Sequence, residues 1–342
     1  MAQYMFDRGH DIVVFTPKDG ELANRLRESN SKIEIVDFQW TKNSYWNPIT
    51  QWSLRNKIKQ ASPHVIIYNS IIDVRAAAFA AKQAGVGTNI YRAGMPAPPK
   101  VDWSYQRAFQ KGLDWVVGIS NENLQIIKRE SPGLISPDMK TKVITNGIDM
   151  ELFKPRLDLS PQDETMVFGN CTRLSDQKGL DMFMHVCHKL KSAQVPRFSA
   201  LLGGTGEDEK KLKDMRRELN LDQDIEMVGF IEDTQDFYPK LDFVLFTSKF
   251  EGSARTIIES LACGVPVIAF DTSSMSEMIE HGVNGFLVSP FDLDTMASHA
   301  KELINDREKC RKMGEAARKY AMEKYNQAII YKNWAELIES HK

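Results

Sequence analysis

Short apolar runs alternate with amphipathic stretches along most of the chain. Most of the apolar runs are continuous, as expected of strands that are covered on both faces. The stretches between them have helical periodicity, so the alternation predicts parallel sheets with right-handed crossovers and an α/β fold. The predicted strands cover residues 11–16, 32–38, 64–69, 88–93, 114–120, 142–147, 165–172, 198–204, 225–230, 243–248, 266–270 and 285–289, and helices are predicted over 75–85, 121–130, 179–192, 207–220, 254–264 and 294–306.

The strand–helix alternation starts again near residue 160. Residues 153–162 contain prolines and acidic residues and few apolar ones, which is typical of a domain boundary. We therefore predict two doubly wound parallel-sheet domains, residues 1–155 and 156–325. Residues 1–9 resemble the end of a helix with Gly9 at its C-cap, where a doubly wound domain usually opens with a strand. The first domain is thus predicted to lack its first strand, and a truncated or mis-started chain is one interpretation.

Composition excludes several function classes. The chain has 342 residues, enough for two domains with a core each, and its 42% hydrophobic and 26% charged content is that of a globular protein. A net charge of −2 provides no basic field for nucleic acid. No apolar run is long enough to cross a bilayer. The four cysteines form no CxxC pair, which favours reduced thiols in a cytoplasmic protein.

One segment of the second half joins a strand to a helix with acidic residues on either side. After the predicted strand 243–248 come Glu251 and then Ser253, which can cap a helix that ends at Gly264. The N-terminus of this helix would lie at the carboxyl edge of a parallel sheet and favour a phosphate. Glu259 in its second turn leans back toward that end and could bind a ribose diol. The glutamate spacing alone is weak evidence, and the strand–loop–helix context strengthens it.

Two further loops open at the same predicted edge. Arg173 and Lys178 follow the strand 165–172, where a guanidinium and an ammonium could bind a diphosphate. Taken alone, two solvated surface cations are an equally good interpretation. Gly203, Gly204 and Gly206 follow the strand 198–204 and would let a ligand approach the backbone, although such a turn is usually only a tight connection.

These motifs resemble glycosyltransferase family 4 (glycosyl transferases group 1), which has the GT-B fold with two Rossmann-like domains facing across a cleft. The resemblance covers roughly residues 140–290 in the family's order, and it is fainter at 8–14 and at Ser120. The matching residues are Asn146 to Asp149 with Phe153 and Pro155, Arg173-Leu174 with Lys178-Gly179, Gly203 to Gly206, Val228 to Phe230, the Glu251–Glu259 pair, Gly264 to Ile268 and Asn284 to Val288.

The resemblance implies a retaining, metal-independent transfer of a sugar from a nucleoside diphosphate, UDP or GDP, to a hydroxyl of a glycan or a lipid-linked acceptor in cell-surface polysaccharide or lipopolysaccharide synthesis. No separate cofactor is implied. Arg173 and Lys178 would hold the diphosphate, Glu251 would face the donor sugar, and Glu259 would bind the ribose. Ser253, Ala254, Arg255 and Thr256 would contact sugar and phosphates, and Gly229, Phe230 and Ile231 would border the base.

The first domain is expected to hold the acceptor. Many relatives carry a histidine near the sugar where this chain reads Ile90 to Pro96, and Arg92 is a substitute candidate. Trp46, with Trp40, Tyr45 and Trp52, could stack on sugar rings, touch lipid or simply pack over the sheet edge. The resemblance also implies peripheral contact with the inner face of the cytoplasmic membrane. It further implies that the helix in residues 326–342 returns to the first domain, with Trp334 as its anchor.

Other interpretations stay open. An inactive sugar-nucleotide-binding protein, a nucleotide-sugar epimerase and a nicotinamide-dependent oxidoreductase share parts of the pattern. The last needs the glycine loop in the first βα unit with an acid after the next strand, and Glu232 or Asp233 is a poor match. The pairs Asp222/Asp224 and Asp292/Asp294 and the neighbours His185 and His188 are expected to be structural rather than metal ligands.

Overall fold

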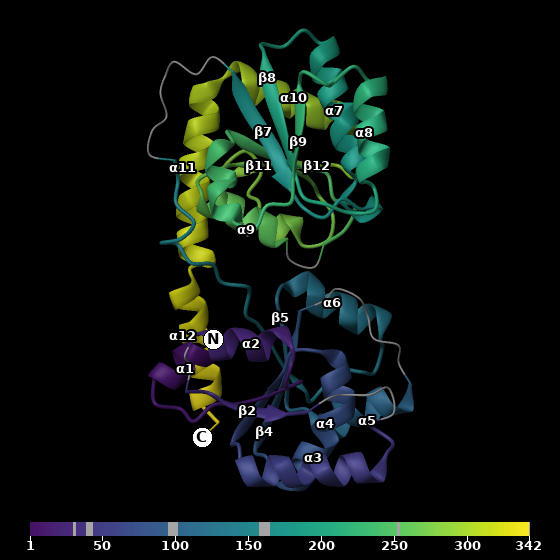
Figure 1. Ribbon diagram of the computed structural model, residues 1–342, viewed down its shortest axis with the longest axis vertical. Coiled ribbons are helices and arrows are strands. Elements are labelled where there is room, and N and C mark those ends of the chain that lie inside the picture. Colours follow the sequence, from purple (N-terminus) through teal and green to yellow (C-terminus); the bar gives the residue numbers. More distant parts are fainter. Residues whose placement is uncertain (30–31, 39–43, 95–101, 157–164, 252–253, 342) are drawn as a thin grey trace. The chain divides into compact units, whose positions relative to one another are not determined.

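The structure is a computed structural model that describes residues 1–29, 32–38, 44–94, 102–156, 165–251 and 254–341. The chain divides into two compact units (Figure 1). The first comprises Met1–Ile144 together with Ile330–Lys342, and the second comprises Thr145–Ile329. Each unit is an α/β layer structure, as the sequence predicts, and each is described by itself below.

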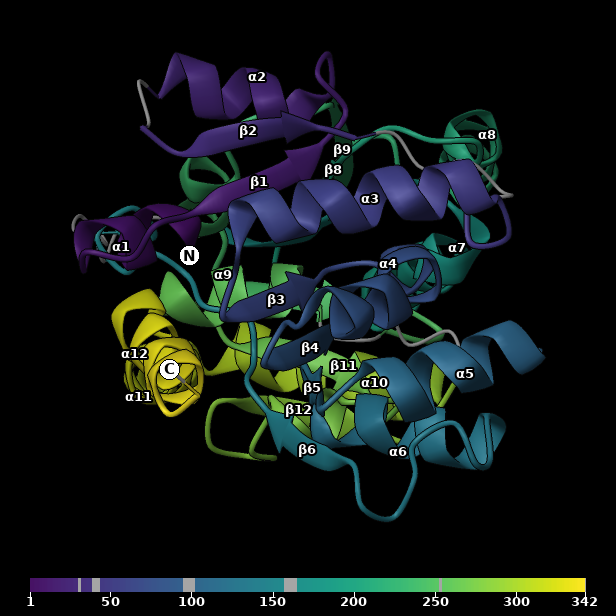
Figure 2. The same cartoon turned by 90° about the horizontal axis from the view of Figure 1, so that it is seen from below.

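The first unit contains two parallel sheets. One has the order β1-β2 and the other β3-β4-β5-β6, and Figure 2 shows the two sets of strands apart from each other. In the given sequence a short helix precedes β1. The elements are α1 (Ala2–Asp7), β1 (Val13–Thr16), α2 (Glu21–Glu28), β2 (Glu34–Asp37), α3 (Pro48–Ala61), β3 (Val65–Tyr68), α4 (Ile71–Ala84), β4 (Thr88–Ala93), α5 (Trp103–Gly112), β5 (Trp115–Gly118), α6 (Asn121–Glu130) and β6 (Lys140–Val143).

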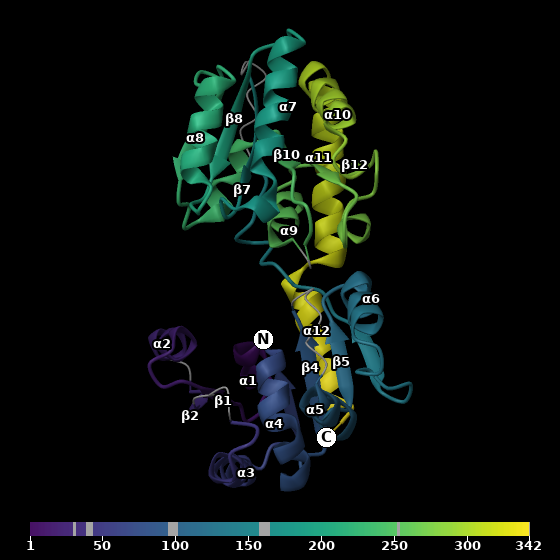
Figure 3. The same cartoon turned by 90° about the vertical axis from the view of Figure 1, so that its right-hand side faces the viewer.

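Helices cover both faces of the four-stranded sheet. Side chains of α3, α4, α5 and α6 form one apolar cluster with the strands, in which Phe109 is fully buried. On the other face lies the last helix of the chain, α12 (Gln327–Glu339), alongside β4 and β5 (Figure 3). Its Ile330, Trp334 and Leu337 share a buried cluster with Ile90 and Val117 of those strands.

The second unit is built on a six-stranded sheet of order β12-β11-β10-β7-β8-β9, all of whose pairs are parallel. Consecutive strands are joined by helices or 3₁₀ turns, as βα crossovers require. The elements are β7 (Met166–Cys171), η1 (Asp176–Lys178), α7 (Leu180–Ser192), β8 (Phe198–Gly203), α8 (Glu209–Glu218), β9 (Ile225–Gly229), η2 (Thr234–Asp236), η3 (Tyr238–Lys240), β10 (Phe243–Phe246), α9 (Arg255–Ala262), β11 (Val267–Phe270), η4 (Met275–Glu277), β12 (Gly285–Val288), α10 (Leu293–Asn305) and α11 (Arg307–Lys324).

Two apolar clusters sandwich this sheet. One joins α7, α8 and α10 to the sheet, and the other joins α9 and α11 to it. Figure 1 shows α7 and α8 on one side of β7, β8 and β9, with α9 and α11 on the other. The central strands β10 and β11 are buried over their whole length. Continuous apolar strands therefore mark a sheet that is covered on both faces.

The division between the units falls earlier than the composition of the sequence suggests. The predicted boundary lies after residue 155, whereas Thr145 already belongs to the second unit. The reason is burial, because Ile148, Met150 and Phe153 pack into the cluster that holds α9 and α11. The prolines that suggested a linker follow these anchors. No helix in the described part of the chain combines the length and apolar character needed to cross a bilayer.

Candidate functional site

The six-stranded sheet of the second unit reverses its strand order between β7 and β10. From β7 the chain builds outward through β8 and β9, and then returns to the other side of β7 with β10. Because all strands are parallel, the loops after β7 and β10 leave the same edge of the sheet side by side. Such a reversal point is where open α/β sheets bind ligands. The predicted cation and carboxylate Lys178 and Glu251 lie on these two loops.

Lys178 and Glu251 form an ion pair across the reversal point. The Lys178 ammonium donates to Oε1 of Glu251, and the two side chains are only 18% and 12% exposed. The backbone N–H of Glu251 also donates to the Ser273 hydroxyl at 3.3 Å, which ties the pair to the loop after β11. The structure thus brings together two residues that are far apart in sequence. A paired ammonium at a sheet edge can exchange its carboxylate partner for a phosphate.

Glu259 is the buried carboxylate of α9. Its side chain is 7% exposed and accepts a hydrogen bond at 2.7 Å from Nε of Arg255, one turn closer to the helix N-terminus. The backward lean expected from the sequence is therefore present. Burial, followed by the negative charge of Glu259, raises the pKa of Cys171 to about 11. The same two causes, in the same order, raise the pKa of Tyr238. Glu259 is accordingly close to the end of β7 and to η3.

The start of α9 differs from the expectation. The sequence predicts Ser253 as the cap, whereas the N-cap position is Ala254, whose side chain has no acceptor, and Ser253 lies outside the described residues. At the C-terminal end of α9, Gly264 has φ +71. Its N–H donates to the Leu261 carbonyl, and the Val265 N–H donates to the Ser260 carbonyl. This pairing is a Schellman motif, so the predicted stop at Gly264 is confirmed.

Thr256, in the first turn of α9, contacts the end of β7. Its hydroxyl donates to the carbonyl oxygen of Cys171 at 3.3 Å. The contact fixes the first turn of α9 beside the loop that carries Arg173 and Lys178.

The glycine loop after β8 packs against the loop after β7. A Cβ on Gly204 would lie 1.8 Å from the carbonyl oxygen of Thr172, and one on Gly206 would lie 2.2 Å from that of Leu174. The backbone N–H of Leu174 donates to Thr205 at 3.0 Å. The group that approaches Gly204 and Gly206 is therefore the chain's own backbone. Gly203 lies beside the Cys171 thiol, at 3.2 Å from the site of its absent Cβ.

The remaining predicted donor residues lie at the outer side of the same edge. Arg173 pairs with Glu207 at 3.3 Å, and both side chains are more than half exposed. Gly229 has φ +75 and its carbonyl accepts the Gly204 N–H at 2.7 Å, which joins the loops after β8 and β9. Phe230 is 73% exposed beside the half-buried Ile231.

The predicted acceptor residues belong to the first unit. Trp46, just before α3, is 56% exposed and its ring lies 4.5 Å from that of Trp103 at the start of α5. Arg92 lies half-buried on β4, and burial lowers its pKa. Trp40 and the segment from Met95 lie outside the described residues.

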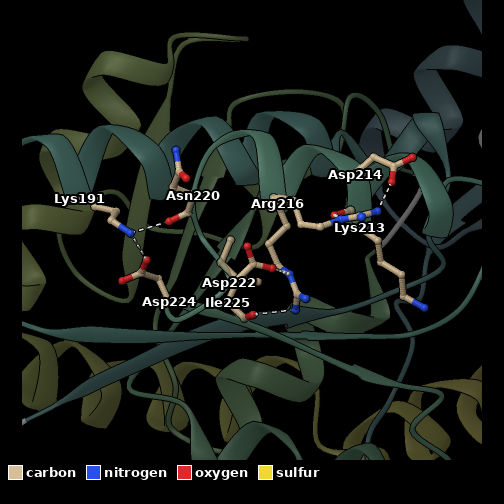
Figure 4. A network of polar contacts seen from close by, with 9 residues as sticks. Lys191, Lys213, Asp214, Arg216, Asn220, Asp222, Asp224 and Ile225 are labelled. Carbon is tan, nitrogen blue, oxygen red and sulfur yellow. Dashed lines mark hydrogen bonds and ion pairs between the residues drawn. The ribbon is translucent and has the colours of Figure 1, made fainter.

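The acidic pairs have structural partners. Asp222 pairs with Arg216 at 3.1 Å and Asp224 with Lys191 at 2.8 Å, which ties α7 and α8 to the turn before β9 (Figure 4). Asp292 caps α10 by accepting from Thr295 N–H, and Asp294 pairs with Lys189. His188 Nδ1 lies 3.3 Å from the Leu219 carbonyl. Over the described ranges, no group of three or more His, Cys, Asp or Glu is arranged to hold a metal ion.

The loops after β7 and β10 are joined by residues that the sequence analysis did not identify. Gln177 binds the loop after β10 through its side-chain amide and its carbonyl, and Lys249 pairs with Asp176. Their partners are mostly backbone groups, which have no side-chain signature in a sequence. Only their position, within two residues of Lys178 or Glu251, could have drawn attention to them.

Curated relatives match part of the chain. It is 28% identical over 245 residues to a putative colanic acid biosynthesis glycosyltransferase, WcaL, of Salmonella typhimurium, which covers 69% of this chain and 59% of the relative. It is 27% identical over 176 residues to a poly(ribitol-phosphate) α-N-acetylglucosaminyltransferase of Staphylococcus aureus, which covers 51% of this chain and 35% of that protein. The chain thus spans only about a third to three fifths of the length of these relatives.

A solved structure shows the same fold. HepE of Anabaena, in complex with UDP and glucose, superimposes with a TM-score of 0.74 at 24% identity and covers 96% of this chain and 91% of its own. Two family models match consecutive parts of the sequence, Glycosyltransferase Family 4 over residues 1–152 and Glycosyl transferases group 1 over residues 156–320. The chain therefore belongs to the family that the sequence motifs predict, the GT-B glycosyltransferases of family 4 and group 1.

Proposed function

We propose that this chain transfers a sugar from a nucleoside diphosphate sugar, UDP- or GDP-linked, to a hydroxyl of a glycan or lipid-linked acceptor in cell-surface polysaccharide or lipopolysaccharide synthesis. The observation that carries the proposal is the Lys178–Glu251 pair at the strand-order reversal beside α9. The UDP bound to HepE supports the donor class, and the poly(ribitol-phosphate) and colanic acid in the relatives' names support the acceptor class.

The site's own groups supply the chemistry of the leaving group. Breaking the sugar–phosphate bond builds negative charge on the diphosphate. In the proposal, Lys178 exchanges its ion pair with Glu251 for one with this diphosphate, and Arg173 exchanges its ion pair with Glu207 in the same way. The positive N-terminal end of the α9 dipole also stabilises the negative charge of the diphosphate. These groups provide the charge that a metal ion would otherwise contribute, so we infer a metal-independent reaction.

The two carboxylates have separate roles in the proposal. Glu251, freed from Lys178, faces the donor sugar, and buried Glu259 accepts hydrogen bonds from the ribose diol. The departing phosphate oxygen takes the proton of the acceptor hydroxyl on the same face, which retains the anomeric configuration. Acceptor binding is assigned to the first unit, with Trp46 and Arg92 as candidates and peripheral membrane contact as part of the hypothesis.

A panel of nucleotide sugars tests the proposal. Release of nucleoside diphosphate is measured with and without glycan or lipid-linked acceptors, together with growth of the acceptor. Glu251→Gln and Glu259→Gln should each lower transfer by at least ~100-fold, since each removes a charge-assisted contact. Glu315→Gln, at an exposed ion pair on α11, serves as the control and should match the unmodified chain.

Three outcomes separate the alternatives. Full activity of both glutamate variants would refute the site assignment. Nucleotide-sugar binding without turnover would instead identify an inactive binding protein. Conversion of one nucleotide sugar into another, or reduction of a nicotinamide, would replace the proposal with an epimerase or an oxidoreductase.

A further inference from the structure

We propose that Gln177 is a positioning residue of the donor site, which holds the two central loops in the register that pairs Lys178 with Glu251. The inference rests on the proposed function for the reaction it concerns, while its structural part stands on the contacts alone. Gln177 lies in η1, after β7, and is half-buried. Its two partners are successive residues of the loop after β10.

Both ends of Gln177 are engaged by that loop. Its carbonyl oxygen accepts the backbone N–H of Lys249 at 2.9 Å, and its side-chain Nε2 donates to the carbonyl of Phe250 at 3.0 Å. The next residues along each loop are Lys178 and Glu251, which form the ion pair. A single residue thereby fixes the register of the two charged side chains with two hydrogen bonds.

The neighbouring contacts set how close the loops can approach. The Thr247 hydroxyl donates to the carbonyl of Lys178 at 3.2 Å. Gly179, with φ +59, follows at once, and a Cβ there would lie 2.3 Å from the carbonyl oxygen of Thr247. Only glycine tolerates this approach at that conformation. The backbone therefore brings the loops together, and Gln177 fixes their alignment.

The outer ion pair between Lys249 and Asp176 is a weaker constraint on the two loops. Lys249 pairs with Asp176 at 2.7 Å, but the Asp176 side chain is 74% exposed. Exposed pairs hold their geometry weakly because water screens them. The amide of Gln177 differs because it is uncharged and bonds to a backbone carbonyl, so salt does not screen its contact.

The expected consequence is a loss of positioning without a loss of folding. Phe250 is 52% exposed, so water can satisfy its carbonyl once the amide is gone, and the fold loses little. Glu251 and Lys178 must nevertheless be placed within a fraction of an ångström for catalysis. Gln177→Met keeps the length of the side chain and removes the donor. It should lower kcat about tenfold while KM for the donor changes less than about threefold.

The experiment compares Gln177→Met with Lys189→Met. The control removes a long-range ion pair, Lys189–Asp294, elsewhere in the same unit. Hydrogen–deuterium exchange of residues 247–251 is measured first, with no substrate, and should be faster in Gln177→Met and unchanged in Lys189→Met. Both variants should keep a melting temperature within about 2 °C of the unmodified chain and the same number of UDP or GDP sites by calorimetry.

The outcomes separate the inference from the proposed function. Unchanged exchange in residues 247–251 of Gln177→Met, or an unchanged kcat, would overturn the positioning role. A fall in the number of nucleotide sites together with a lower melting temperature would assign Gln177 to the fold and also overturn it. If the unmodified chain turns over no nucleotide sugar, the proposed function fails, and the exchange measurement still decides whether Gln177 holds the loop.

Discussion

Two glycines of the second unit, Gly204 and Gly282, have positive φ for different physical reasons. Gly204 has φ +121, a region that side chains rarely adopt, and its absent Cβ would overlap the carbonyl oxygen of Thr172. Gly282 also has positive φ, at +79, but a Cβ there would meet no atom within 4 Å. The two positions therefore separate steric crowding from conformational preference.

This difference predicts unequal effects of alanine. Gly282→Ala should lower the free energy of unfolding by ~1 kcal/mol, the usual conformational penalty. Gly204→Ala should cost at least ~3 kcal/mol, because Thr172 and its loop must also move. Urea unfolding of the two variants measures both values. Equal losses would show that the approach of Thr172 to Gly204 is not a constraint on the fold.

The described cysteines are free thiols whose ionisation is opposed by burial. Burial first, and the negative charge of Glu259 second, raises the pKa of Cys171 to about 11, while burial raises that of Cys263 to about 12. The folded state thus keeps protons that the unfolded chain loses near pH 8.5. The contribution to stability is complete below that pH and is lost as pH rises toward the folded pKa values.

Thiol labelling checks this pH dependence. At pH 8 the native chain should react with iodoacetamide much more slowly than the chain in guanidinium, and the native rate should rise with pH up to about 11 at Cys171. Cys171 should react before Cys187, because it is half-buried and Cys187 is fully buried. Cys171→Ser serves as the assignment control. Equal labelling rates in native and unfolded chains at pH 8 would contradict the assigned burial.

At the scale of elements, hydrophobic patterning predicts most of the strands and helices of the second unit. The segment from Thr145 to Pro155 shows its limit, because its composition resembles a linker. In the structure, Arg318 of α11 donates to the carbonyls of Phe153 and Met150 at 2.6 and 3.0 Å. The segment is thus fixed by a residue more than 150 positions later, and pattern reasoning has no access to such a contact.

The sequence predicts part of the candidate site, namely the part that depends on local patterns. Strand ends and capped helices are local, so the loops that carry Lys178, Glu251 and Glu259 could be placed at one sheet edge from their sequence. Direct pairing of Lys178 with Glu251 and of Arg173 with Glu207 depends on strand order, which local patterns do not determine. The role of Gln177 was missed because its partners are backbone groups of the loop after β10.

At the scale of the whole molecule, chain order and spatial order differ. The first unit is assembled from both ends of the chain, since Ile330–Lys342 belongs to it although Thr145–Ile329 does not. On either side of Asn326, two backbone hydrogen bonds hold the chain to Ile148. The Ile148 N–H donates to the Tyr325 carbonyl, and the Gln327 N–H donates to the Ile148 carbonyl. The stability of the first unit therefore depends on a helix that follows the whole second unit in the sequence.

Substitution of Trp334 tests whether the stability of the first unit depends on α12. It is 2% exposed in the cluster that joins α12 to β4 and β5, so Trp334→Ala should lower the stability of the first unit by ~3–5 kcal/mol. Ile329, 41% exposed on the same helix, provides the control, and Ile329→Ala should have little effect. Hydrogen exchange assigns the loss: protection should fall in β4 and β5 and persist in β7 and β8. Because the donor-site residues belong to the second unit, UDP or GDP binding should survive the substitution. Equal loss of protection in both sheets would instead mean that the two units unfold as one.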